Sequence, residues 1–152
     1  MAKVLLLYTS LTGNTELMAE SMLDELKGRN MELDVKLFDD FDIAVPDLLH
    51  YDVIFIGIYT WVGGDVPLDV EDFFDALYKI DLSGRVFGVF GSADSDYPDY
   101  GTAAIMMHEQ LAKLGGTMIP DLIISDLDPT EEEITRCKQM VNTAFELLDT
   151  AK

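Results

Sequence analysis

Short apolar runs alternate along the chain with segments of helical periodicity. Most of the runs are continuously apolar and rich in Val, Ile, Leu and Phe, as is typical of parallel strands buried on both faces. Five strands are predicted, over Lys3–Tyr8, Leu33–Phe38, Asp52–Tyr59, Arg85–Gly91 and Thr117–Ile124. Only the second run alternates apolar and polar positions, which predicts that it lies at an edge of the sheet.

The intervening segments space their apolar residues as amphipathic helices do. Four helices are predicted, over Thr15–Lys27, Val70–Ile80, Thr102–Leu114 and Glu131–Leu148, with one short helix near Pro46–Leu49. Strands that alternate with helices predict an α/β fold in which helices cover both faces of a parallel sheet. We therefore expect residues 1–152 to form a single doubly wound domain, a three-layer sandwich with a five-stranded parallel sheet.

The composition limits the partners and the compartment. The chain has 10 Lys and Arg against 29 Asp and Glu, a formal charge of −19, which excludes nucleic acid and anionic membranes as natural partners and favours a basic protein. Its one cysteine, Cys137, excludes an internal disulfide and a multi-cysteine metal site and is consistent with a cytoplasmic location. Cys137 lies on the apolar stripe of the last predicted helix, so we expect a buried thiol. No apolar run is long enough to cross a membrane.

Hydroxyl and amide groups fill the loop after the first predicted strand, which reads Thr9-Ser10-Leu11-Thr12-Gly13-Asn14-Thr15. A helix start offers backbone N–H groups and the positive end of a dipole, a favourable place for a phosphate. The loop lacks the sequence patterns of nucleoside triphosphate and dinucleotide loops. It also has no Lys or Arg, so we predict that neutral donors hold the monophosphate of a larger ligand there. The alternative is a polar connection whose Thr caps the helix.

Aromatic residues follow the third and fourth predicted strands, in the loops Tyr59-Thr60-Trp61-Val62-Gly63-Gly64-Asp65 and Gly91-Ser92-Ala93-Asp94-Ser95-Asp96-Tyr97-Pro98-Asp99-Tyr100. Ligands of doubly wound sheets bind beyond the carboxyl ends of the strands, where these loops lie. Loops run over the surface, so we do not expect large aromatic side chains there to be core residues. We predict that they clasp a planar ligand. Half-buried loop anchors are the alternative, and the neighbouring phosphate loop makes it less favourable.

With these motifs, the sequence resembles the flavodoxins of the short-chain type, from Lys3 to the carboxyl terminus. The family's pattern of an aromatic strand end, a loop rich in Thr and Ser and a following helix matches Leu6-Leu7-Tyr8, Ser10, Gly13-Asn14-Thr15 and Ala19. Met22 and Val62 depart from it, because the family more usually has Leu, Ile or Val at the first position and often Gly at the second. The brief turn Ser125–Asp128 leaves no room for the insertion of long-chain members.

The resemblance implies a flavodoxin-like fold with strand order 2-1-3-4-5 and one tightly bound FMN. It assigns the FMN phosphate to Ser10, Thr12, Asn14 and Thr15. It places Trp61 and Tyr97 on the two faces of the isoalloxazine, and Asp94 near the ring and the ribityl chain. The other expected cofactor-binding residues belong to the same three loops: Thr9, Leu11, Gly13, Thr60, Val62, Gly63, Gly64, Ser92, Ala93 and Tyr100.

The implied function is that of a low-potential one-electron carrier rather than an enzyme. The alternative is an FMN-dependent NAD(P)H reductase of the same fold, which needs an open flavin face for the nicotinamide. Aromatic side chains on both faces would leave only the ring edge, and this favours the carrier. A phosphoreceiver domain is excluded, because Thr9-Ser10 and Tyr59-Thr60 stand where it needs acidic residues.

The resemblance also implies partners for a monomeric carrier. They are basic redox proteins, such as a ferredoxin/flavodoxin-NADP reductase, and acceptor enzymes. An acidic surface around the ligand is the predicted docking site. Its members are Asp65, Asp69, Glu71, Asp72, Asp94, Asp96 and Asp99.

Overall fold

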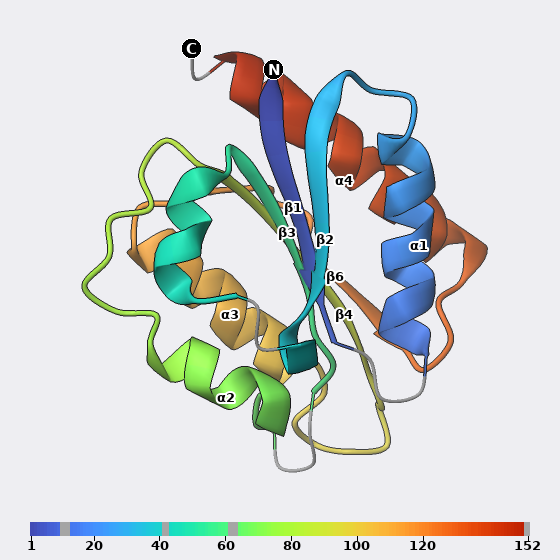
Figure 1. The fold of residues 1–152 in the computed structure, drawn as a ribbon. Helices are drawn as coiled ribbons and strands as arrows, with labels where there is room; N and C mark the ends of the chain where they lie inside the picture. The colour runs from blue at the N-terminus through green and yellow to red at the C-terminus, as the bar shows by residue number, and fades with distance from the viewer. Residues whose placement is uncertain (10–12, 41–42, 61–63, 151–152) are drawn as a thin grey trace.

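A parallel sheet lies between two helical layers in the computed structural model, which describes residues 1–9, 13–40, 43–60 and 64–150 (Figure 1). The strands are β1 (Ala2–Tyr8), β2 (Met31–Leu37), β3 (Val53–Gly57), β4 (Val86–Ala93), β5 (Thr117–Met118) and β6 (Ile123–Asp126). The helices are α1 (Asn14–Leu26), α2 (Leu68–Asp75), α3 (Thr102–Lys113) and α4 (Glu131–Thr150), with the 3-10 helices η1 (Phe38–Asp40) and η2 (Val45–His50).

The strand order is β2-β1-β3-β4-β5, with β6 also paired to β4, and every pairing is parallel. The predicted doubly wound fold and the order 2-1-3-4-5 are thereby confirmed. The alternating strand, β2, lies at an edge as predicted, whereas β1, β3 and β4 form the centre.

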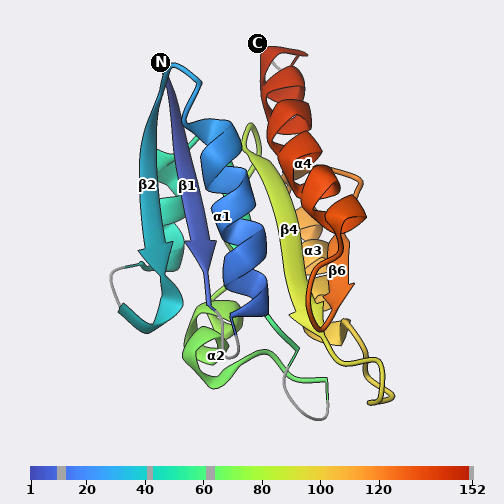
Figure 2. The same cartoon turned by 90° about the vertical axis from the view of Figure 1, so that its right-hand side faces the viewer.

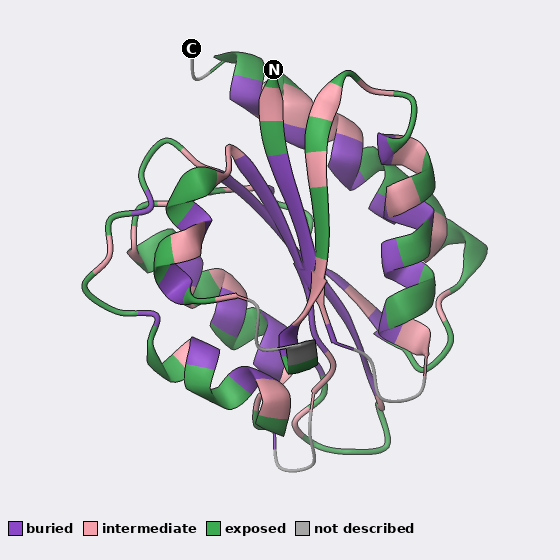
Figure 3. Ribbon diagram, in the orientation of Figure 1, coloured by how far each residue is buried: buried purple, intermediate pink, exposed green. Residues whose placement is uncertain are grey.

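Successive residues of the central strands face opposite helical layers, which explains why these strands are continuously apolar. Val4 and Leu6 of β1 pack with α1 and α4, and Leu5 and Leu7 pack with α2 and α3. The two helix pairs lie on opposite sides of the sheet (Figures 1 and 2). The central strands are buried along most of their length (Figure 3). Cys137 is fully buried in the layer of α1 and α4, as predicted, and burial raises the pKa of its thiol to about 12.

The prediction of one continuous strand over Thr117–Ile124 is wrong. The chain pairs with β4 twice, first as β5 and then as β6, and Pro120 lies in the gap between them. Proline has no N–H to donate to the strand ladder, so the pairing is interrupted there. As a result the sheet formed by the described residues has six strand segments rather than five, and β6 extends to Asp126 at the carboxyl edge.

The predicted helix over Val70–Ile80 is also too long, because α2 ends at Asp75. Lys79 has a φ of 55°, in the left-handed region that a helix cannot continue through. The apolar positions of the predicted stripe beyond Asp75 therefore belong to a turn. The other three long helices and the short helix agree with the predictions to within two residues at each end. In the described part of the chain, no helix is both long and apolar enough to cross a membrane.

Candidate functional site

The carboxyl ends of β1, β3 and β4 bring the predicted site loops to one edge of the sheet. The strands pair in register, with Tyr8 beside Gly57 and Gly57 beside Phe90. The starts of α1, α2 and α3 lie at the same edge (Figure 1). Ser10, Leu11, Thr12, Trp61, Val62 and Gly63 belong to the predicted site but lie outside the described residues. The predictions about them therefore remain predictions.

Helix α1 begins directly behind the predicted phosphate loop. Gly13 is its N-cap residue with φ at 90°, a left-handed conformation that glycine adopts without a steric penalty. Because glycine has no side chain, it cannot cap the helix as Ser or Thr would. Asn14 and Thr15 are the first two helical residues. Their backbone N–H groups belong to the helix turn that attracts anions.

Thr9 is fixed by two contacts that cross the sheet edge. Its backbone N–H donates to the carbonyl oxygen of Gly57 at 3.0 Å, which continues the ladder between β1 and β3. Its hydroxyl donates to Oδ2 of Asp69 in the first turn of α2. Asp69 therefore ties the end of β1 to α2. The charge of Asp69 also acts on Tyr59, because burial, and then this charge, raise the pKa of Tyr59 above its usual value.

Thr15 joins the same edge to β4. Its Oγ1 lies 2.8 Å from Oγ of Ser92 in a buried hydrogen bond between residues 77 positions apart. The carbonyl oxygen of Ser92 accepts the backbone N–H of Thr60 at 3.1 Å. The hydroxyl of Thr60 in turn accepts the N–H of Ala103 at 3.3 Å. The three predicted loops are thus held together by one set of hydrogen bonds.

A small cavity of about 60 Å³ lies between the loops after β3 and β4. It is lined by Thr60, Gly64, Ala93, Asp94, Tyr97, Asp99 and Tyr100. All of these except Asp99 are predicted cofactor-binding residues, and Asp99 is a predicted docking residue. The structure therefore brings these residues of the two aromatic loops together around one cavity.

The walls of this cavity leave little room at Gly64. Its φ is 83°, and a Cβ placed there would lie 2.8 Å from Cβ of Asp99. A side chain at this position would therefore meet both a strained backbone and the opposite wall.

The loop after β4 is ordered by its own turn. The carbonyl oxygen of Asp94 accepts the N–H of Tyr97 at 3.1 Å, and Oδ1 of Asp94 accepts the N–H of Asp96 at 3.0 Å. The turn presents the Tyr97 ring at the surface, where it is 51% exposed. Tyr100 donates to the carbonyl oxygen of Ile124 at 3.4 Å. Burial, and then nearby carboxylates, raise the pKa of Tyr100 above its usual value.

Asp126 is a site residue that the sequence reasoning missed. Its carboxylate accepts the backbone N–H of Ser95 at 3.0 Å and the Ser95 hydroxyl at 2.5 Å. These hydrogen bonds hold the pKa of Asp126 below its usual value. The contact fastens the loop after β4 to the end of β6. The only available signal was an acidic residue just after a predicted strand, and the misplaced end of that strand concealed it.

Known proteins resemble the chain over most of its length. Residues 6–139 match the family described as Flavodoxin. A probable flavodoxin 1 of Bacillus subtilis is 34% identical over 139 residues, which cover 91% of this chain and 87% of the relative. A flavodoxin of Maridesulfovibrio salexigens is 38% identical, with 88% and 92% covered. The crystal structure of oxidised flavodoxin 1 from Bacillus cereus superposes with a TM-score of 0.89 at 34% identity, covering 95% of this chain and 98% of that one.

Proposed function

The chain belongs to the flavodoxin family of FMN-binding electron carriers, and we propose that it shuttles single electrons between a basic reductase and acceptor enzymes on FMN held at the carboxyl edge of the sheet. FMN supplies the redox chemistry, and the chain binds, orients and shields it. The alternative, an FMN-dependent NAD(P)H reductase, is less favourable if Trp61 and Tyr97 cover both ring faces. The observation that carries the proposal is the convergence of the three predicted loops at one edge.

We assign the phosphate to the loop 9–15. Helix α1 starts there, directly after Gly13, and its first-turn N–H groups suit an anion. Thr15 is fully buried and already bonded to Ser92, so its hydroxyl is held in one position before the ligand arrives. Such preorganisation reduces the entropy lost on binding.

We assign the isoalloxazine to the loops after β3 and β4. The Tyr97 side chain is 51% exposed to solvent. An exposed aromatic side chain is stabilised when a planar group stacks on it. The cavity of about 60 Å³ beside it is far smaller than typical ligand pockets of roughly 300–1,000 Å³. The ring would therefore lie against the loops rather than enter a deep pocket. Trp61 would cover its other face.

Redox partners would dock on the exposed carboxylates around this edge, and the chain would act as a cytoplasmic monomer. Asp65, Glu71, Asp72 and Asp96 are exposed there, and the chain carries a net charge of −19. Opposite charges steer association and speed encounter at low ionic strength. The rate of reduction by a basic reductase should therefore fall as salt is raised.

Purification without added flavin tests the central proposal. The protein should carry FMN, with its two visible absorption bands, and NADPH alone should fail to bleach them. Bleaching by NADPH without a second protein would favour the NAD(P)H reductase instead. Replacing Tyr97 with Ala should weaken FMN binding and restore flavin fluorescence, whereas Tyr78→Ala, at a tyrosine that is 60% exposed and outside the described lining of that cavity, should do neither.

A further inference from the structure

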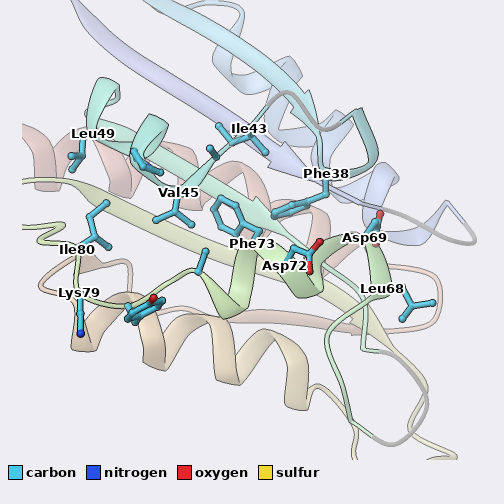
Figure 4. A pocket seen from close by; sticks show the side chains of 14 residues that line it. Phe38, Ile43, Val45, Leu49, Leu68, Asp69, Asp72, Phe73, Lys79 and Ile80 are labelled. Atoms are coloured by element: carbon cyan, nitrogen blue, oxygen red, sulfur yellow. The ribbon is translucent and has the colours of Figure 1, made fainter.

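A large apolar groove lies between η2 and α2, outside the FMN site (Figure 4). Its volume is about 1060 Å³. Phe38 and Phe73 meet edge to face at its centre, with ring centroids 5.2 Å apart. Leu49 comes from the η2 side, and Ile80 comes from the turn after α2. The volume is at the top of the range for ligand pockets, so the groove has room for several apolar side chains.

Large apolar side chains at the rim of this groove are exposed to water. Leu68 is 72% exposed, Tyr78 is 60% exposed and Leu49 is 40% exposed. An isolated exposed leucine is ordinary, but three such residues around one apolar groove form a patch of the kind that marks an interaction site. Covering them would remove apolar surface from water, which favours binding.

The two ends of the groove carry opposite charge. Asp69 and Asp72 lie at one end and Lys79 at the other (Figure 4). Asp69 also accepts the hydroxyl of Thr9, so the acidic end reaches the carboxyl edge of the sheet, where we place FMN. Glu71 adds a further exposed carboxylate on α2. Among the described residues that line the groove, Lys79 is the only basic one.

Charge decides which occupant suits the groove. Two copies of a chain with a charge of −19 repel each other, which disfavours a second copy, and an anionic membrane surface is disfavoured for the same reason. A protein segment that carries Lys or Arg beside its apolar side chains complements both the acidic end and the apolar lining.

We propose that this groove docks a basic amphipathic segment of a redox partner. The inference rests on the proposed function, because it extends the acidic docking surface into an apolar anchor. The apolar side chains of the segment cover Leu49, Leu68 and Tyr78, which are exposed. Phe38 and Phe73 line the groove but are themselves buried, and the basic side chains of the segment lie near Asp72. Docking in this way brings the partner to the edge of the sheet at which Thr9 lies.

Two synthetic peptides of about 14 residues test the groove. Both contain Leu and Lys in the same numbers, but one has Leu at helical spacing on one face and the other has the order permuted so that no apolar face forms. Each is titrated into the FMN-loaded protein at physiological ionic strength, and NMR chemical shifts report the affinity and the contact site. The amphipathic peptide should bind at least tenfold more tightly than the permuted one.

Two variants fill the groove from opposite sides. Ala44 and Ala76 line it and are exposed, so tryptophan at either position occupies the groove without entering the core. Ala44→Trp and Ala76→Trp should each weaken the amphipathic peptide at least tenfold. The matched control is Ala112→Trp, at an exposed alanine of α3 outside the groove lining, which should bind the peptide like the original protein.

A charge variant tests the acidic end. Asp72→Lys should weaken the amphipathic peptide about two- to fivefold, as expected for loss of an exposed charge pair. Asp149→Lys, at an exposed residue of α4 on the opposite face of the sheet, changes the net charge equally and should have a smaller effect.

Equal binding of the two peptides, or equal binding of the amphipathic peptide by the groove-filled variants and the Ala112→Trp control, would overturn the inference. The proposed function is read separately, from the absorption of bound flavin. A protein that holds FMN but does not distinguish the peptides therefore overturns the groove alone.

Discussion

Replacing Thr15 with valine removes one hydroxyl from the buried pair that joins the start of α1 to the end of β4. The Oγ atoms of Thr15 and Ser92 are 2.8 Å apart, and Thr15 is fully buried. Valine has nearly the same shape as threonine, so the packing is kept while the Ser92 hydroxyl loses its partner. A buried polar group left without a partner costs about 1–3 kcal/mol. Thr15→Val should lower the free energy of unfolding of the FMN-free protein by that amount.

A double-mutant cycle separates this hydrogen bond from other effects of the substitutions. Ser92→Ala leaves the Thr15 hydroxyl without its partner and should cost a similar amount. The double variant lacks both hydroxyls, so no polar group is left unsatisfied, and it should cost little more than either single change. Urea unfolding of the four proteins, each freed of FMN, measures the coupling, which we expect to be about 1–2 kcal/mol.

Additive single changes would refute this reasoning. A coupling below about 0.3–0.5 kcal/mol is what independent sites give, and it would mean that the two hydroxyls do not depend on each other. FMN affinity gives a second readout. Thr15→Val should weaken FMN about tenfold if the hydroxyl contributes a charge-assisted hydrogen bond to the phosphate, whereas Thr15→Ser keeps the hydroxyl and should bind FMN more tightly than Thr15→Val does.

Three further predictions concern a buried thiol, a half-buried histidine and the cavity wall. Cys137, whose thiol pKa burial raises to about 12, should react with an aromatic disulfide reagent only as the protein unfolds, and rapid labelling of the folded protein would contradict its burial. Burial lowers the pKa of His108 in the folded protein, so as the pH falls the unfolded chain binds the proton first, and the folded protein loses stability below about pH 6.5. The His108→Gln variant should therefore lose less stability than the original protein between pH 7 and pH 5, and equal losses in the two proteins would refute this. Gly64→Ala should weaken FMN about tenfold, because strain of about 1–2 kcal/mol and the contact with Asp99 displace the cavity wall. Gly84→Ala, also at a positive φ but with nothing within 4 Å of its Cβ, should leave the FMN affinity unchanged, and equal effects of the two substitutions would argue against the displacement.

The central strands could be predicted because burial on both faces leaves an unmistakable apolar run. The errors came where the backbone departs from the apolar pattern. Pro120 interrupts a run that is otherwise apolar, and α2 ends at Asp75 although the apolar stripe continues to Ile80, past the positive φ of Lys79. Apolar periodicity reports which positions are buried or semi-buried, but it does not report where backbone hydrogen bonds stop.

The site was predicted as three loops, and the contacts between them were not. Thr15 and Ser92 are 77 residues apart, and Ser95 and Asp126 are 31 apart. Such pairs depend on strand register and on the place where each strand ends, neither of which is encoded locally. The groove could not be predicted for a related reason, because in the sequence Leu49 and Ile80 have the apolar pattern of core residues. Only the relative placement of η2 and α2 leaves a gap between them.

The acidic residues around the site fall into two groups that a count of charges does not distinguish. Asp69 holds the Thr9 hydroxyl, and Asp94 accepts a backbone N–H of its own loop. Charge reversal at either one would disturb the FMN loops and slow electron transfer for that reason alone. Glu71 and Asp72 are exposed on α2. A change there alters what a partner meets while the loops keep their hydrogen bonds. Slower reduction by a basic reductase is therefore evidence for docking when it follows charge reversal at Glu71 or Asp72 and the FMN affinity is unchanged.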